Sequence, residues 1–194
     1  AECFAEAGAW VFATDCDEAA AQKTAARIRE RGHRAESLLL DVSDETACRT
    51  AVQRVTEECG RCDVLVNNAG VGHVGTILTT KPEELERLWK VNVLGIYQLS
   101  RAVLPGMIVR RSGSIVNIAS IAGLMGMEAR FAYTTTKHAV VGMTRSMAMD
   151  LGTQGVRINC ICPGRVRTPF VDEMLRQYDN PEDYLRQMEA PHAM

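Results

Sequence analysis

Hydrophobic and polar positions along the chain follow two alternating patterns. Short apolar runs rich in β-branched residues predict five strands, at 10–14, 36–40, 63–67, 114–119 and 156–162. Longer amphipathic stretches between them predict helices, at about 17–31, 43–58, 82–101 and around Tyr133. This alternation predicts right-handed crossovers and one parallel sheet with helices on both faces. The run DVLVN at 63–67 is apolar enough for burial on both faces.

Two of the helices carry recognisable start signals. Ser43, with Glu45 and Thr46 close behind it, resembles a capping motif before the second helix. Pro82 is favourable in the first turn of the third helix. No repeat, linker or low-complexity tract divides the chain, so we expect a single domain over residues 1–194.

Bulk composition narrows the class of protein. The chain has 194 residues, 46% apolar and 24% charged, with a net charge of −2 and scattered basic residues. These values are ordinary for a globular domain and favour neither a nucleic-acid nor a membrane partner. Seven cysteines, an odd number, favour reduced thiols and a cytoplasmic location.

The CGRC segment at 59–62 has the spacing of a redox pair or of half a zinc site. No second pair of cysteines and no nearby histidine completes a ligand set. The segment also lies where a helix ends, not at a helix start that would stabilise a thiolate. We therefore interpret these as incidental loop cysteines and expect no metal.

Each predicted strand is followed by a polar or glycine-bearing segment. Asp15 follows the first strand, Asp41 the second, NNAG (67–70) the third, Ser120 the fourth and PGRVRTP (163–169) the fifth. The carboxyl ends of parallel strands form one rim, where ligands bind in sheets of this kind. The sequence therefore places five candidate binding segments together.

Tyr133 and Lys137 lie four positions apart in FAYTTTKHAVVG, so they share one face of the predicted helix. A tyrosine packed on a lysine stem at the surface would give the same spacing. The chemical interpretation is that the ammonium lowers the pKa of the phenol, which is ordinarily about 10. His138 points about 100° away around the helix and is expected to pack.

Four features of the sequence occur together. NNAG, a serine thirteen residues before a YxxxK motif, VNV around Asn92, and PGRVRT resemble the short-chain dehydrogenase/reductase family, from the first residue to about Phe170. The resemblance implies an α/β, doubly wound, Rossmann-like parallel sheet. It also implies an NAD(P)-dependent oxidoreductase that acts on a secondary alcohol or ketone.

The resemblance assigns four catalytic residues. Tyr133 is the acid/base; Lys137 lowers its pKa and holds the nicotinamide ribose; Ser120 orients the substrate oxygen. Asn92 supports the lysine, through a water relay. Ser120 could instead cap the strand end, and Asn92 could be satisfied locally within its helix.

The resemblance also assigns a dinucleotide site. The residues concerned, besides Tyr133 and Lys137, are Asp15, Asp41, Val42, Asn68, Gly70, Val166 and Thr168. Asp15 would accept hydrogen bonds from both adenosine-ribose hydroxyls and repel a 2′-phosphate, so NAD is favoured over NADP. The alternative for Asp15 is a helix N-cap, for which Asp17 is an equally good candidate.

The family begins with a strand and a glycine-rich turn that are absent from this sequence, which opens at AECFAEAGAW, and it ends with a further strand and helix. We therefore expect a fragment in which two neighbouring strands lack the strand between them. Residues 168–194 are expected to cover the substrate.

The substrate pocket is expected to take side chains from two loops and from Phe170 onward; the loop residues are His73, Leu124, Met125 and Met127. Arg130 and Arg165 could meet a polyol or carboxylate, although solvated surface arginines are the more common case. Sugars or polyols, hydroxy acids, 3-hydroxyacyl thioesters and steroids all remain open.

Two other functions are compatible with the same residues. One is an NADP-dependent carbonyl reductase of 3-oxoacyl type, and the other is a non-catalytic nucleotide-binding scaffold. The resemblance further implies a homo-oligomer, a tetramer or dimer, formed through the Tyr133 helix and its predecessor.

Overall fold

The computed structural model describes residues 1–164 and, beyond them, 166, 168, 171–172, 175–176, 180–182 and 186. The elements in chain order are α1 (Glu2–Glu6), β1 (Val11–Asp15), α2 (Glu18–Glu30), β2 (Ala35–Leu39), α3 (Glu45–Cys59), β3 (Val64–Asn67), α4 (Pro82–Trp89), η1 (Lys90–Leu94), α5 (Gly95–Arg110), β4 (Gly113–Ile118), η2 (Ile121–Gly123), α6 (Phe131–Leu151), η3 (Gly152–Gln154) and β5 (Val156–Ile161). Arg165, Phe170 and most of the expected covering segment lie outside the described residues.

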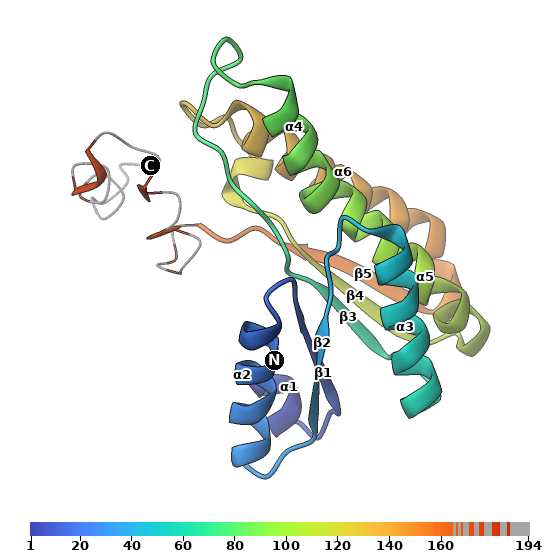
Figure 1. The fold of residues 1–194 in the computed structure, drawn as a ribbon. Coiled ribbons are helices and arrows are strands. Elements are labelled where there is room, and N and C mark those ends of the chain that lie inside the picture. Colours follow the sequence, from blue (N-terminus) through green and yellow to red (C-terminus); the bar gives the residue numbers. More distant parts are fainter. Residues whose placement is uncertain are drawn as a thin grey trace.

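All strand pairs are parallel, which confirms the predicted α/β class. The strands form two sheets, β1–β2 and β3–β4–β5, rather than one (Figure 1). Among the described residues, β1 pairs only with β2, and β3 pairs only with β4. The expectation that two strands would each have an unpaired edge is therefore confirmed.

One face of the β3–β5 sheet packs on helices, and the other is exposed in the part of the chain that the structure describes. Inward residues of β5 alternate with exposed ones, so that Val156 and Ile158 join the core with Val103, Met107 and Ile115 of the neighbouring elements. Val64 and Val66 of β3 are 42% and 39% exposed. The prediction that this strand is buried on both faces is therefore wrong for the described residues, because the described helices cover only the side that carries Leu65 and Asn67.

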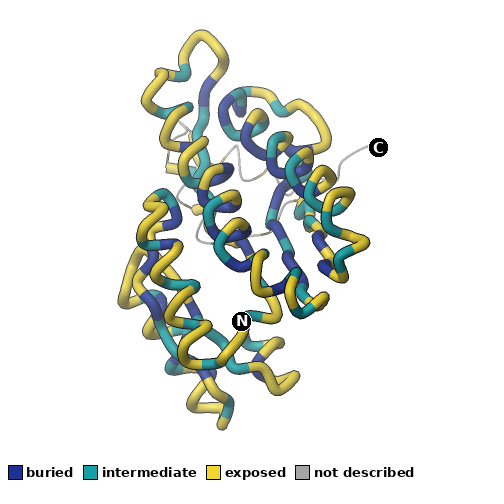
Figure 2. The backbone as a smooth tube through the Cα atoms, turned by 90° about the vertical axis from the view of Figure 1, so that its right-hand side faces the viewer, coloured by how far each residue is buried: buried dark blue, intermediate teal, exposed yellow. Residues whose placement is uncertain are grey.

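Helices α1 and α2 cover the β1–β2 sheet through a cluster of Ala5, Ala25, Ile28 and Ala35. Figure 2 shows that buried positions lie along the inner sides of the helices and exposed positions along their outer sides. Among the described helices, none is both long and apolar enough to span a bilayer.

Aspartates cap two helices. Asp17 accepts hydrogen bonds from the amides of Ala19 and Ala20 at the start of α2. Asp44 does the same for α3, from Thr46 and Ala47. The predicted Ser43 cap is therefore wrong, because the helix begins one residue later and Ser43 bonds to Asp41.

The helix predicted at 82–101 is α4, a π-helical turn η1 and α5, which continues to Arg110. A π turn adds a residue to the helix and changes the direction of the side chains after it. Asn92 lies in the middle of this turn.

Candidate active site

Helix α6 brings Tyr133 and Lys137 to the carboxyl ends of β4 and β5. Tyr133 lies in the first turn of α6 and Lys137 in the second, on one face. The Lys137 ammonium lies 5.6 Å from the centroid of the Tyr133 ring. The alternative that the spacing left open, a tyrosine packed on a lysine stem at the surface, is excluded because Lys137 is only 4% exposed.

Ser120 joins this pair from the end of β4. A hydrogen bond from Ser120 stabilises the Tyr133 phenolate oxygen. The Ser120 oxygen also accepts a hydrogen bond of 3.1 Å from the amide of Ala122, which caps η2. The capping and catalytic interpretations of this serine are thus compatible.

Gly123 allows the Ser120 segment to approach α6 closely. A Cβ at this position would lie 2.6 Å from the carbonyl oxygen of Lys137, closer than carbon and oxygen can pack. A glycine is therefore required where η2 crosses α6, and the Ser120–Tyr133 contact depends on that crossing.

The pKa of Tyr133 is raised, because burial outweighs two groups that lower it, the Ser120 hydrogen bond and the charge of Arg130. The structure thus shows no net lowering of this pKa, and the effect of Lys137 on the phenol stays a prediction. The two groups that lower this pKa, Ser120 and Arg130, come from the end of β4 and from the residue before α6.

Lys137 is held by the backbone of β4. Its ammonium donates a hydrogen bond of 2.9 Å to the carbonyl oxygen of Ile118. Burial lowers the pKa of Lys137 from 10.5 to about 8. The side chain is thus a buried cation that loses its proton more readily than an exposed lysine.

Asn92 binds the backbone that follows NNAG. Its Oδ1 accepts a hydrogen bond from the amide of Val71 at 2.8 Å, and its Nδ2 donates to the carbonyl of Val71 at 2.9 Å and to Thr136 Oγ1 at 3.1 Å. A Cβ on Gly70 would touch both Asn92 Oδ1, at 3.4 Å, and Lys137 Nζ, at 3.5 Å. Asn92 therefore lies beside the lysine, although its hydrogen bonds go to other groups.

A buried polar chain behind the site was not singled out from the sequence. Asn67 Nδ2 donates to Asn117 Oδ1 at 2.8 Å, and Asn117 Nδ2 donates to Thr144 Oγ1 at 2.9 Å. These bonds tie β3 and β4 to α6. The first asparagine of NNAG was the available signal, but the sequence does not show which residues it meets.

Arg130 is 2% exposed, so the expectation of a solvated surface arginine is wrong. It immediately precedes α6, where a parallel bridge pairs it with Gly75. Its charge acts on Tyr133, as the lowering of the phenol pKa by Arg130 shows. The structure therefore adds a second cation to the surroundings of the phenol.

Of the two acidic candidates for the adenosine end, Asp15 is the last residue of β1 and Asp41 follows β2 by two positions. Asp15 Oδ1 accepts a hydrogen bond of 2.9 Å from the amide of Asp17, and the side chain is exposed. Asp41 Oδ1 accepts bonds from the amide and hydroxyl of Ser43, at 2.8 and 2.7 Å. The N-cap of α2 is Asp17, so Asp15 does not serve as that cap.

The other cofactor candidates differ in exposure. Val42 is buried in a core cluster with Leu40, Cys48 and Leu99. Asn68 is exposed, and Thr168 is half-buried. Val166 is 56% exposed. Their contacts with a dinucleotide remain predictions.

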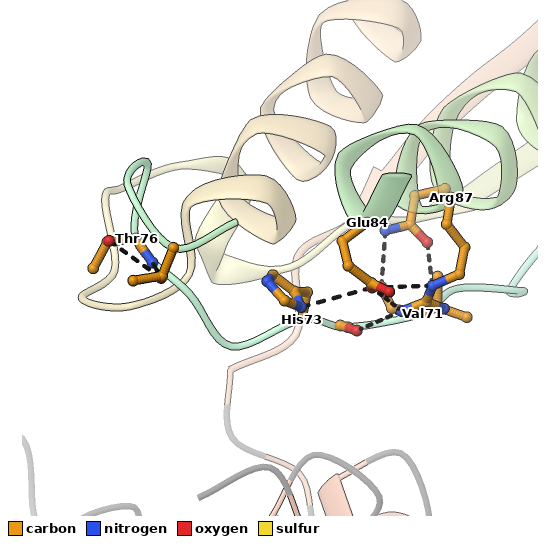
Figure 3. A network of polar contacts seen from close by, with 8 residues as sticks. Val71, His73, Thr76, Glu84 and Arg87 are labelled. Carbon is orange, nitrogen blue, oxygen red and sulfur yellow. Dashed lines mark hydrogen bonds and ion pairs between the residues drawn. The ribbon is translucent and has the colours of Figure 1, made fainter. Parts of the chain in front are cut away.

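A pocket of about 400 Å³ opens beside the loop that follows NNAG, lined by His73, Thr79, Lys81, Glu84 and Arg87. Glu84 lies 3.7 Å from His73 Nδ1 and 2.9 Å from Arg87 Nη2, and the guanidinium of Arg87 also donates to the carbonyl of Gly72 (Figure 3). This network fixes the loop against α4. Of the residues predicted for the substrate pocket, His73 lines this one.

The remaining candidates lie in less constrained places. Leu124 and Met125 are 57% and 54% exposed on the segment after Ser120, and Met127 is half-buried there. His138 is exposed, and its Nδ1 lies 3.0 Å from the carbonyl oxygen of Thr134 on its own helix, so the expectation that it packs is wrong. In the CGRC segment, burial is the largest cause that raises the pKa of the Cys62 thiol. A raised pKa disfavours a reactive thiolate.

The sequence pattern that defines the short chain dehydrogenase family matches residues 1–179. The chain belongs to this family. It is 40% identical over 163 residues to the oxidoreductase UcpA of Escherichia coli K12, covering 84% of this chain and 62% of UcpA. The chain thus spans less than two thirds of that relative.

Two solved structures share the fold at 31% identity and a TM-score of 0.84. One is a gluconate 5-dehydrogenase from Burkholderia cenocepacia J2315 in complex with NADP and tartrate, covering 94% of this chain and 71% of that chain. The other is an NAD⁺-bound xylitol dehydrogenase, covering 91% of this chain and 72% of that chain. Both cofactors therefore occur among structures similar to this one.

Proposed function

We propose that the protein is an NAD-dependent oxidoreductase that interconverts a secondary alcohol and a ketone. One observation carries the proposal: Ser120 hydrogen-bonds the oxygen of Tyr133, and Lys137 lies 5.6 Å from the same ring. The three side chains meet at the carboxyl ends of the strands, where ligands bind in this fold.

The residues present fit a nicotinamide dinucleotide. Asp15 offers a carboxylate for the adenosine ribose, and Lys137 offers an ammonium beside Gly70 for the nicotinamide ribose. Asp41, Val42, Asn68, Val166 and Thr168 complete the proposed site. The cofactor supplies the hydride acceptor or donor when bound.

The protein's own groups handle the proton. In oxidation, Tyr133 takes the proton from the substrate hydroxyl, and in reduction it returns one. Ser120 holds the substrate oxygen while charge develops on it. The hydrogen bond of Ser120 to Tyr133 and the charge of Arg130 both favour the phenolate. Asn92 keeps the Val71 backbone in place beside Lys137.

NAD is proposed over NADP because Asp15 ends β1 with an exposed carboxylate that would repel a 2′-phosphate.

We further propose a cytoplasmic homo-oligomer. Its contact would use the outer faces of α5 and α6, where Val109 and Met149 are 85% and 84% exposed.

Fluorescence titration of the full-length protein with NADH and NADPH tests the cofactor. Tighter binding of NADH is expected, and tighter binding of NADPH would favour the carbonyl-reductase alternative. Turnover of a panel of secondary alcohols with NAD tests the activity. Binding of a dinucleotide without turnover of any alcohol would favour the scaffold, and binding of neither dinucleotide would contradict the proposal.

A further inference from the structure

The proposed reaction gives no role to most of the pocket beside the loop after NNAG. This pocket has a volume of about 400 Å³, and the described residues that line it all have polar side chains: His73, Thr79, Lys81, Glu84 and Arg87. Pockets for apolar ligands have mostly hydrophobic walls. The lining therefore favours a polar or charged group of a ligand.

The net charge of this pocket comes from Lys81. Glu84 and Arg87 offset each other, because Arg87 Nη2 lies 2.9 Å from Glu84 Oε2, and the same guanidinium donates to the carbonyl of Gly72 (Figure 3). Lys81 is exposed, and in the described part of the chain its ammonium has neither an ion pair nor a hydrogen bond. With His73 neutral, the lining carries one net positive charge.

The backbone that carries Lys81 is fixed on both sides. The carbonyl of Lys81 accepts hydrogen bonds from the amides of Glu84 and Leu85 at 3.1 and 3.2 Å, at the start of α4. Just before it, the amide of Thr80 donates to the carbonyl of Thr76 at 2.9 Å. The ammonium is therefore attached to a well-positioned base at the wall of the pocket.

The pocket lies within the length of a substrate molecule from the catalytic groups. A Cβ on Gly70 would lie 3.5 Å from Lys137 Nζ, and His73 is three residues further along, at most about 11 Å of extended chain. Gly75, two residues beyond His73, forms the parallel bridge with Arg130 directly before α6. Both ends of this loop segment are thus held beside α6, and the pocket opens between them and α4.

We propose that Lys81 binds a carboxylate at the end of the substrate that lies away from the carbinol carbon. An ammonium binds an oxyanion through charge-assisted hydrogen bonds. The single net charge of the pocket matches a carboxylate better than a phosphate monoester, which carries about −1.5 to −2. The position of the pocket requires several bonds between the carbinol and the carboxylate. This inference rests on the proposed function and selects extended hydroxy acids from the open substrate classes.

Matched substrates test the inference on the full-length wild-type enzyme. Each pair is an acid and its amide, and the acids are 3-hydroxybutanoate, 5-hydroxyhexanoate, 7-hydroxyoctanoate and 9-hydroxydecanoate. With NAD, we expect kcat/KM to be about five-fold higher for the acid at one of the longer lengths, and about equal for the shortest pair; the effect is modest because Lys81 is exposed. Equal values within every pair, or a preference that is largest for the shortest acid, would overturn the inference and leave the proposed function intact.

A variant series assigns the preference to Lys81. Lys81→Gln should bring the ratio of acid to amide close to one, mostly through a higher KM for the acid, and Lys81→Arg should keep most of the ratio. Lys23→Gln removes a positive charge from an exposed position of α2, and as the control it should leave the ratio unchanged. An unchanged ratio in folded Lys81→Gln would overturn the assignment.

The outcomes separate this inference from the proposed function. A wild type that oxidises other secondary alcohols but none of these acids and amides would overturn the inference alone. Absence of turnover for every secondary alcohol would overturn the proposed function itself.

Discussion

The ammonium group of Lys137 donates a hydrogen bond to the carbonyl oxygen of Ile118 across 2.9 Å, which joins α6 to the last residue of β4. This buried position lowers the pKa of Lys137 from 10.5 to about 8. The unfolded chain therefore holds more protons than the folded one between these two pH values. The free energy of unfolding should rise with pH across this window, because the cost of burying the charge disappears.

Relative to Lys137→Met, the wild type should gain about 2 kcal/mol of stability between pH 7 and 9.5. Urea unfolding of both proteins at several pH values measures this difference, and the comparison cancels the titration of other groups. A constant difference across the range would show that Lys137 keeps an ordinary pKa.

Removal of the Tyr133 hydroxyl should stop catalysis without disturbing cofactor binding. Tyr133→Phe should lower kcat by a factor of about 10² to 10⁴, while the Kd for NADH stays within about two-fold. Lys137→Met should damage both values, because we assign it contacts with the cofactor as well. Tyr97→Phe, at a 47% exposed tyrosine, is the control. Equal loss of NADH binding in both site variants would contradict this division of roles.

Two neighbouring aspartates should separate cofactor choice from helix stability. Asp15→Ser should lower the preference for NADH over NADPH by about 100-fold, because the ribose loses its acceptor and the 2′-phosphate loses a repelling charge. Asp17→Ala removes the N-cap of α2 and should cost about 1 kcal/mol of stability with no change in preference. Titration and thermal unfolding measure the two effects, and a change of preference in Asp17→Ala would refute the assignment.

Close packing at Gly123 should be sensitive to a single methyl group. Gly123→Ala forces η2 away from the carbonyl of Lys137, which lies 2.6 Å from the added carbon. We expect a loss of about 1–3 kcal/mol in stability and a lower kcat, because Ser120 moves with η2. Gly126→Ala, where no atom lies within 4 Å of the new carbon, should change neither. Unaltered kcat in the first variant would separate Ser120 from this crossing.

The polar chain behind the site should contribute to stability. Thr144→Val removes the acceptor of the Asn117 amide, which donates across 2.9 Å in a buried position. The unfolding free energy should fall by about 1–3 kcal/mol, the cost of a buried donor without a partner. Thr135→Val, at an exposed position of the same helix, should change it by less than about 0.5 kcal/mol. Similar values for both variants would show that the chain is dispensable.

Local patterns were sufficient for most of the secondary structure. Strand and helix positions follow from the spacing of apolar residues, and the predicted strands agree with the structure to within one or two residues. The π turn at Lys90–Leu94 was not predicted, because the expected helix ran through these residues without interruption. The predicted Ser43 cap was wrong because Asp44, one residue later, is an equally suitable cap and accepts the hydrogen bonds at the start of α3.

Long-range contacts account for the other differences. The sequence predicted a helix on each face of the sheet, but Val64 and Val66 are exposed because the described helices cover one face of β3. Arg130 was expected at the surface from its residue type. Its burial depends on the Gly75 segment, more than fifty residues earlier in the chain, and no local pattern reports such a meeting.

The sequence by itself determined the strand–helix alternation, the carboxyl-end rim, and the choice of Ser120, Tyr133 and Lys137 as candidate site residues, because periodicity and motif spacing are local properties of a chain. Only the tertiary structure decided which charges surround the phenol. Burial raises the pKa of Tyr133 and lowers that of Lys137, and the charge that favours the phenolate comes from Arg130. These effects depend on distance and solvent access, which exist only once the segments have packed together.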